Sequence, residues 1–511
     1  MGIFSSTRVP PPEVPTDTVI PLREMDSLPL SVGICNEFSF YFEDALDVRK
    51  LQGALDRLVN KDKWRKMGAR LRRNKDGNLE YHIPQEYSEK RPGVLYSQQT
   101  FETSIVDHPV LSEIPKGNGE RPVLMQPSWH FRPYMRGPNS PRSLEDWLYT
   151  DIPQLAIHFV IFKDATIFTL TYLHSFMDGS GLGTLTQAWT AVLRGEDDSL
   201  PPFIGYEHAD DPLAALRQQR PGSDYVLAQK ALKGWGFFIF VVRQMLERLW
   251  WPREEARVVC IPSSYVKRLA GVARAELDAD HRAQDGAESG PQPFVSESDV
   301  LLAWWVMTAV RALEPARGRT VALINAFDSR ALLAEMGLLP RPDAAFLGNA
   351  AYGCVTLSPA RNYLRDTTDG PLAPLAASIR RDLLTQRTVE QLQAQSAALH
   401  ESLASAGRAP LYGSSDMMFF AYSNFNTFKL YEADFSHALL ATEADGAHKV
   451  YSGAHRRGTP TWIGSTSTEA GFSPRNTGVF MGKDKAGYWW LFACLRKGAW
   501  KKIEEQFKAC P

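Results

Sequence analysis

The stretch TIFTLTYLHSFMDGSGLGTLTQAWTAVL (166–193) decides the fold. Its first eight residues alternate and are rich in β-branched and aromatic side chains, so they predict a strand. LAIHFVIF (155–162) has the same pattern, and only three residues separate it from the first segment. The two strands together therefore predict a β-hairpin. After a short turn, GLGTLTQAWTAVL (181–193) predicts a helix. A hairpin that leads directly into a helix is typical of α/β proteins.

The turn between that strand and helix, HSFMDG (174–179), is the strongest candidate site. His174 ends the strand, Asp178 follows four residues later, and Gly179 allows a tight entry into the helix. Ligand-facing groups of α/β proteins commonly lie at such junctions. The residues alone leave a second reading open, in which the ring nitrogens of His174 are satisfied by backbone groups and Asp178 only caps the helix.

Strand and helix patterns alternate on both sides of this junction. Strands are predicted early at NEFSFYFED (36–44) and late at MMFFAYSNF (417–425), YEADF (431–435), TGVFMG (477–482) and GYWWLFACL (487–495). We therefore predict an α/β protein built of two similar sheets. The expected division is residues 1–205, a crossover at 206–255, and residues 256–511.

Composition excludes several classes of protein. The 511 residues carry 57 Lys and Arg against 58 Asp and Glu, so no global basic field favours nucleic acid. Five scattered Cys argue against a disulfide framework, and no His, Cys or Glu spacing predicts a metal site. The first 25 residues lack the apolar stretch of a secretory signal, so we expect a cytoplasmic protein. Gly2 and Ser6 fit a myristoylation pattern, although the apolar residues between them can equally dock on the domain.

The crossover contains an unusually apolar segment, GWGFFIFVVRQMLERLWW (234–251), which is too short and too charged for a membrane span. A helical stripe runs along it through Phe238, Val241, Val242, Met245 and Leu249. We predict that this stripe packs on the protein. Peripheral contact with a membrane, anchored by the tryptophans, is the alternative.

Three segments together resemble the BAHD acyltransferases, a branch of the chloramphenicol-acetyltransferase-like superfamily. They are HSFMDG, the pair NAFDSRALL (325–333) and FLGNAAYG (346–353), and LYEADFSHA (430–438), in family order along most of the chain. The amino-acid sequence around these segments is most similar to that of fungal members that modify specialised metabolites. The resemblance implies two pseudo-equivalent domains of mixed sheet with flanking helices. A channel between them would admit acyl-CoA from one mouth and the acceptor from the other.

The resemblance also implies roles for the residues of the first two segments. His174 would act as the general base that takes a proton from the acceptor, with no covalent acyl-enzyme. Asp178 would face away from the substrate and form a structural ion pair with an arginine, and Gly179 would support the turn. We take Arg330 as that arginine, with Arg319 and Arg341 as alternatives.

The third segment departs from the family's DFGWG, because Ser436, His437 and Ala438 replace Gly, Trp and Gly. Asp434 would keep a structural role. His437 would lie near the channel or, as the favoured reading, at the surface. Upstream, Ser423 and Asn424 fall where the family has small hydroxyl residues, and they are our candidates for stabilising the oxyanion.

Local charge for the CoA phosphates is found only at Lys449, Arg456 and Arg457, and a solvated surface loop is the alternative reading. The expected function is O-acyl transfer, first of all acetyl transfer, from acyl-CoA to a hydroxyl of a fungal terpenoid or polyketide. We expect no tightly bound cofactor, and a monomer suffices. Alternatives are cyclisation, hydrolysis or transfer from a carrier protein on the same scaffold, or a non-catalytic ligand-binding relative. A condensation-type enzyme would need a second His at Leu173.

Overall fold

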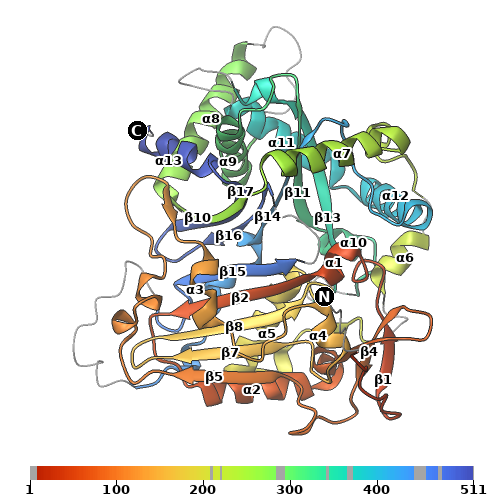
Figure 1. The fold of residues 1–511 in the computed structure, drawn as a ribbon, viewed down its shortest axis with the longest axis vertical. Helices are drawn as coiled ribbons and strands as arrows, with labels where there is room; N and C mark the ends of the chain where they lie inside the picture. Colours follow the sequence, from red (N-terminus) through yellow and green to blue (C-terminus); the bar gives the residue numbers. More distant parts are fainter. Residues whose placement is uncertain are drawn as a thin grey trace, which may run out of the picture.

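The structure is a computed structural model. The residues that it describes are 8–207, 211–218, 221–283, 294–340, 344–364, 372–441, 456–469 and 475–509. Two mixed sheets with helices against their faces form the body of the protein (Figure 1), so the predicted α/β class is confirmed. Gly2, Ser6, Arg341 and Lys449, for which the sequence predicts roles, lie outside the described residues.

The N-terminal half centres on a five-stranded sheet. Its strands, in spatial order, are β15 (Trp462–Glu469), β2 (Ile34–Phe42), β8 (Thr166–Leu173), β7 (Ala156–Ile161) and β5 (Leu95–Thr100). Every residue of β8 is buried, because α2 (Val48–Asn60) and α5 (Gly179–Leu193) cover one face and α3 (Ser128–Met135) packs on the other. The alternation of a strand explains this sandwich, since Phe168 meets Trp189 of α5 while Thr169 faces the α3 side.

The C-terminal half centres on a seven-stranded sheet. Its strands, in spatial order, are β13 (Ala351–Pro359), β11 (Thr320–Asp328), β14 (Met418–Asn424), β16 (Thr477–Lys483), β17 (Tyr488–Arg496), β10 (Glu254–Pro262) and β6 (Val123–Met125). One face carries α8 (Ser263–Ala283), α9 (Glu297–Leu313), α11 (Leu372–Gln386) and α13 (Ala499–Ala509). The other face carries α7 (Gly234–Trp250) and α12 (Val389–Ala406).

Smaller elements join these two bodies. Two minor sheets are formed by β1 (Thr18–Pro21), β4 (Leu79–Ile83) and β3 (Arg70–Arg73), and by β12 (Ala345–Phe346) with β9 (Phe203–Ile204). The remaining α-helices are α1 (Pro29–Gly33), α4 (Leu144–Leu148), α6 (Pro212–Gln218) and α10 (Arg330–Glu335).

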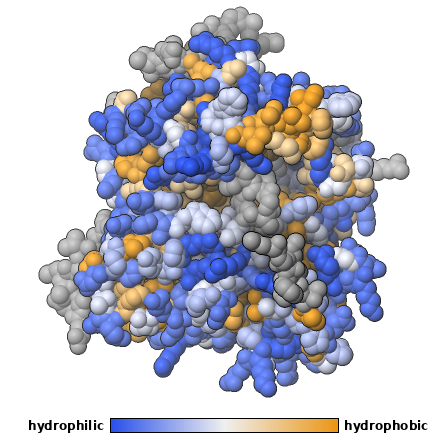
Figure 2. Space-filling view, viewed as in Figure 1, coloured by the Kyte–Doolittle hydropathy of each residue, from blue (hydrophilic) through white to orange (hydrophobic). Residues whose placement is uncertain are grey.

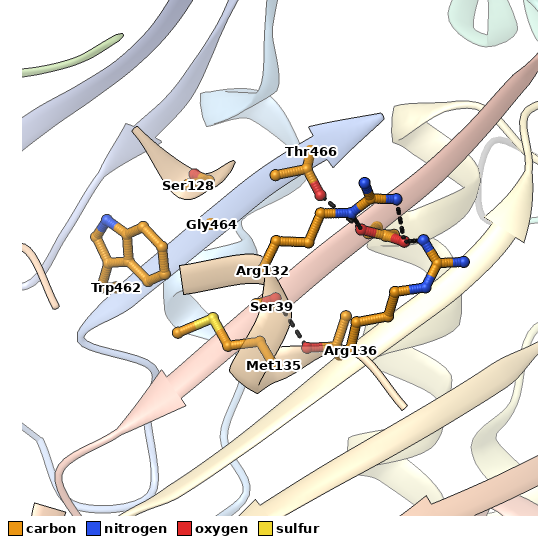
Figure 3. A pocket seen from close by; sticks show the side chains of 10 residues that line it. Ser39, Ser128, Arg132, Met135, Arg136, Trp462, Gly464 and Thr466 are labelled. Carbon is orange, nitrogen blue, oxygen red and sulfur yellow. Dashed lines mark hydrogen bonds and ion pairs between the residues drawn. The ribbon is translucent and has the colours of Figure 1, made fainter. Parts of the chain in front are cut away.

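The two halves exchange strands. β15, late in the chain, pairs antiparallel with β2, and the early β6 pairs antiparallel with β10. A buried carboxylate, Glu37 on β2, fixes the first exchange: it accepts from Arg132 at 2.6 Å and from Thr466 of β15 at 2.8 Å (Figure 3). The adjoining space, about 10 Å³, holds at most one water, so this cluster is structural. The division at 205 and 256 stays a prediction, and neither large sheet is made from one side of it alone.

Two predictions are wrong. YEADF forms no strand; residues 430–432 are a short 3₁₀ helix, and Phe435 inserts between Phe168 and Trp189 of the N-terminal core. Most of the stripe on α7 does not pack on the protein as predicted: Val241 does, but Phe238, Met245 and Leu249 are 55%, 59% and 78% exposed. Among the described residues, no helix is long and apolar enough to cross a membrane.

Candidate active site

His174 lies in the turn directly after β8. Its backbone N–H donates to the carbonyl of Ile34 at 2.8 Å, and its own carbonyl accepts from the side chain of Asn349 at 2.9 Å. The imidazole is half-buried, and its buried Nδ1 has no hydrogen-bond partner among the described residues. The backbone is therefore held on both sides, while the ring is not tied to backbone groups as the structural alternative required.

Asp178 begins α5 and connects it to the second half. Its Oδ1 accepts from the N–H of Gly181 at 2.8 Å, which caps the helix, and its Oδ2 accepts from the N–H of Ala350 at 3.0 Å. The guanidinium of Arg330 binds both carboxylate oxygens, at 2.9 and 3.1 Å. The side chain is 5% exposed, so Asp178 is an internal joint between the halves.

Arg330 is held from all sides by acceptors. Besides Asp178, it donates to Asp328 at 2.8 Å and to the carbonyls of Phe346 and Gly348 at 3.0 and 2.7 Å. Burial alone would lower the pKa of this guanidinium, but the charges and hydrogen bonds of Asp178 and Asp328 raise it above its ordinary value. Arg319, the described alternative, pairs with Glu247 instead.

A buried polar layer behind the turn supports His174. Asp26 accepts from both the backbone and the side-chain N–H groups of Asn349, each at 2.8 Å. Burial raises the pKa of Asp26, although Lys66 and Asn349 oppose it. Burial also lowers the pKa of Lys66 to about 7, a shift reinforced by Arg23 and opposed by Asp26. The motif GNAAYG pointed to Asn349, but nothing in the sequence singled out Asp26 or Lys66.

A cavity of about 420 Å³ opens at this junction. It lies where β11 and β14, which run parallel, end, and where α5 and α9 begin. Ser423 and Asn424 line it, as does Ser180, which donates to Asp328 at 2.9 Å. Asp328 in turn binds Arg330, so one chain of contacts leads from the cavity wall to Asp178. His174 itself is not among the lining residues.

One side of this cavity suits an anion. The N-terminus of α9, capped by Ser296, lines it, with Arg380 of α11 and Arg387 just after that helix; the carboxylates that line the cavity, Asp299 and Asp328, each lie beside an arginine. Helix N-termini and guanidinium groups both favour negative charge. Arg380 lies 3.4 Å from Asp299 and stacks over Phe294, whereas Arg387 is exposed at the rim.

The residues predicted from the third segment lie elsewhere. Asp434 caps Ser436 at 2.9 Å and pairs with Arg456 at 2.6 Å; burial opposes these contacts, but they hold the pKa of Asp434 below its ordinary value. Arg457 lies 3.2 Å from Asp44, and His437 is exposed. None of these residues lines the cavity. Across the described ranges, no group of three or more His, Cys, Asp or Glu is placed to hold a metal ion.

Gly179 is required for space rather than for an unusual backbone angle. A Cβ there would lie 2.6 Å from the ring of Phe425 and 2.7 Å from that of Phe428, two rings beside the cavity. We expect Gly179→Ala to lower the free energy of unfolding by about 1–3 kcal/mol through overpacking. Gly53→Ala, in open space inside α2, should instead raise it by about 0.5–1 kcal/mol. Denaturant unfolding measures both, and equal stability of Gly179→Ala and wild type would contradict the argument.

A bidentate Asp–Arg pair joins the two α/β halves beside a His-bearing turn, as the resemblance to the chloramphenicol-acetyltransferase-like acyltransferases implies. The comparisons agree. The chain is 43% identical to the protein named transcriptional regulator sdnM of Sordaria araneosa, over 99% of this chain and 100% of that protein. It is 38% identical to acetyltransferase sphE of Aspergillus fumigatus, over 98% and 97%. The fold matches TRI101 of F. sporotrichioides, solved with coenzyme A and T-2, with a TM-score of 0.64 at 15% identity over 96% and 98%. No family model matches.

The chain therefore belongs to the BAHD-type acyltransferases of fungal secondary metabolism, which are acyl-CoA-dependent enzymes. The fold expected from the resemblance, two sheets of the chloramphenicol-acetyltransferase-like kind, is confirmed. The roles of individual residues remain predictions.

Proposed function

We propose that this enzyme transfers an acyl group, first of all acetyl, from acyl-CoA to a hydroxyl of a fungal terpenoid or polyketide. The observation that carries the proposal is the Asp178–Arg330 joint, which holds the His174 turn beside a cavity with a cationic wall. Acceptors of this kind are consistent with the T-2 bound to TRI101. One chain supplies both halves of the site, so a monomer is sufficient. The proposed location is the cytoplasm.

In this mechanism His174 is the general base. Its imidazole takes the proton of the acceptor hydroxyl as that oxygen forms a bond to the thioester carbonyl. The tetrahedral adduct then expels the CoA thiolate, which receives the proton from the imidazolium, and the acyl group stays on the acceptor oxygen. The fixed backbone of His174, bound to Ile34 and Asn349, keeps the ring in place during both transfers.

Ser423 and Asn424 support the adduct in this proposal. Both end β14 and line the cavity, where a donor aimed at the developing oxyanion contributes most. The Oδ1 of Asn424 accepts from the N–H of Asn426 at 3.0 Å, which leaves its NH₂ as the group that donates. Ser423 carries the hydroxyl expected from the family.

Donor phosphates are held by the cationic wall, with Arg387 at its rim and the N-terminus of α9 behind it. This differs from the predicted set of Lys449, Arg456 and Arg457, so the two sites can be compared directly. Arg456 provides a control, because it is 65% exposed and bound to Asp434.

Acetyl-CoA should raise the thermal midpoint of the wild-type protein, since a ligand at 100 times its dissociation constant adds about 2.7 kcal/mol to the folded state. Arg387→Ala should weaken this shift, whereas Arg456→Ala should leave it intact. The measurement is thermal unfolding with acetyl-CoA, longer acyl-CoAs and free CoA. If Arg456→Ala weakened the shift and Arg387→Ala left it intact, the phosphate site would be assigned to Arg456 instead. No shift with any CoA would overturn the donor assignment in favour of a carrier-bound acyl group or another reaction.

A further inference from the structure

The outer face of α7 is a continuous apolar surface. Figure 2 shows a hydrophobic patch over this helix, in the upper part of the view. Its exposed side chains are Trp235, Phe238, Ile239, Val242, Met245, Leu246, Leu249, Trp250 and Trp251. The spacing of three and four residues puts the first eight on one side of the helix, and monomeric proteins rarely leave such a surface uncovered.

The helix is fixed in place by its inner face. Phe240 is buried against Ala322 and Met417, and Phe237 and Val241 pack beside it. Near the other end, Glu247 forms an ion pair with Arg319. Because one side of the helix already packs on the seven-stranded sheet, the helix cannot rotate to bury the outer stripe.

The charges carried by the helix segment itself are mostly of one sign. Arg243 and Arg248 are exposed and, at 3.6 residues per turn, fall on opposite flanks of the stripe; Lys233 and Arg253 are exposed at its two ends. Residues 233–253 hold these four cations and one carboxylate, that of Glu247, which faces inward to Arg319. The segment is therefore net cationic, and carboxylates of other elements lie beside its ends: Asp224 and Glu401 near Lys233, and Glu314 near Trp251.

The charges of this segment indicate what covers the apolar surface of α7. A second copy on a two-fold axis would bring the same cations together, which costs energy at the edge of the contact. An anionic lipid surface complements the net positive charge of this segment. Tryptophans at both ends of the helix match the side chains that settle at the level of lipid headgroups, and flanking arginines extend toward the phosphates.

We propose that α7 lies in the plane of an anionic membrane surface, with its outer stripe among the acyl chains and its four cations at the headgroups. The helix does not cross the membrane; it attaches the enzyme peripherally. This assignment is independent of the reaction proposed above, because it uses no residue of the cavity.

The test is co-sedimentation of the full chain with vesicles of phosphatidylcholine alone and of phosphatidylcholine mixed with phosphatidylserine. The wild-type protein should bind the mixed vesicles and lose binding as salt is raised. Two variants separate the two contributions: Leu249→Ser with Trp250→Ser removes apolar contact, and Arg243→Glu with Arg248→Glu reverses the flanking charge. Each should weaken partitioning by about tenfold or more.

The matched control is Val106→Ser with Val272→Ser, which removes two side chains 69% and 49% exposed away from α7. It should bind as wild type, and thermal unfolding should show all variants folded, since every change is at the surface. The proposal would be overturned if the wild type failed to bind the mixed vesicles, or if either α7 variant bound them as well as wild type does. Light scattering without lipid measures the oligomeric state. A wild-type dimer that is lost in the variant with Leu249→Ser and Trp250→Ser would assign the patch to a second copy instead.

Discussion

Replacing His174 with alanine should lower kcat for acyl transfer by about 10²–10⁴, the usual contribution of a general base. The imidazole is the titratable group that the β8–α5 turn presents, and its Nδ1 has no competing partner among the residues described. Without it, the acceptor hydroxyl keeps its proton as it approaches the thioester. Turnover with acetyl-CoA and a panel of terpenoid and polyketide alcohols measures the loss.

Two controls keep this result specific. The thermal midpoint of His174→Ala and its shift with acetyl-CoA should match those of wild type, because the half-buried ring supplies neither a joint of the fold nor a phosphate contact. His437→Ala, which changes an exposed histidine of the third segment, should keep full activity. A His174→Ala enzyme that acylates as fast as wild type would refute the general-base role.

The Arg330→Met variant should lose about 3–5 kcal/mol of unfolding free energy. Removing the guanidinium leaves Asp178 and Asp328 without their shared cation, and an unpaired carboxylate in a buried site is strongly unfavourable. Three further contacts of the same guanidinium, to Asp328 and to the carbonyls of Phe346 and Gly348, stabilise the pair, so the loss exceeds that of an ordinary ion pair. Denaturant unfolding, followed by tryptophan fluorescence, measures it.

The comparison variant is Arg194→Met. Arg194 also makes two bonds to one carboxylate, that of Glu196, but the partners are 30% and 48% exposed, so the unfolding free energy should hardly change. Arg330→Lys should recover only part of the lost stability, because an ammonium cannot bind both oxygens of Asp178 in a fork. Equal losses for Arg330→Met and Arg194→Met would show that the joint between the halves is not held by this pair.

Local sequence signals predicted the centre of the fold. The β7–β8 hairpin, the turn and α5 all lie where alternation, helical periodicity and an Asp cap placed them. The edges were harder. β15 carries no alternation that would mark a strand, because Trp462 and Ile463 are followed by small and polar residues, and its partner β2 lies more than 400 residues earlier. YEADF does alternate, yet Phe435 packs into the aromatic core instead.

The candidate site divides in the same way. The motif residues His174, Asp178 and Arg330 were nameable in advance, and the structure places Arg330 on Asp178. Arg380 and Arg387 were not, because an arginine on an amphipathic helix such as α11 resembles any solvated residue until the fold brings it to the cavity. The serines at the start of α9 were not named as site residues either, since a serine at that position is typical of any helix N-terminus.

Strand exchange also sets the order in which the chain can fold as it is synthesised. When the ribosome has completed the first half, β2 is still an open edge, because residues 462–469 emerge only near the end. An uncovered edge strand can pair with other chains, so the nascent protein has a long interval of exposure before β15 arrives. Chaperone occupancy during translation is therefore expected to persist until the last fifty residues are made, and heterologous expression should improve at lower synthesis rates.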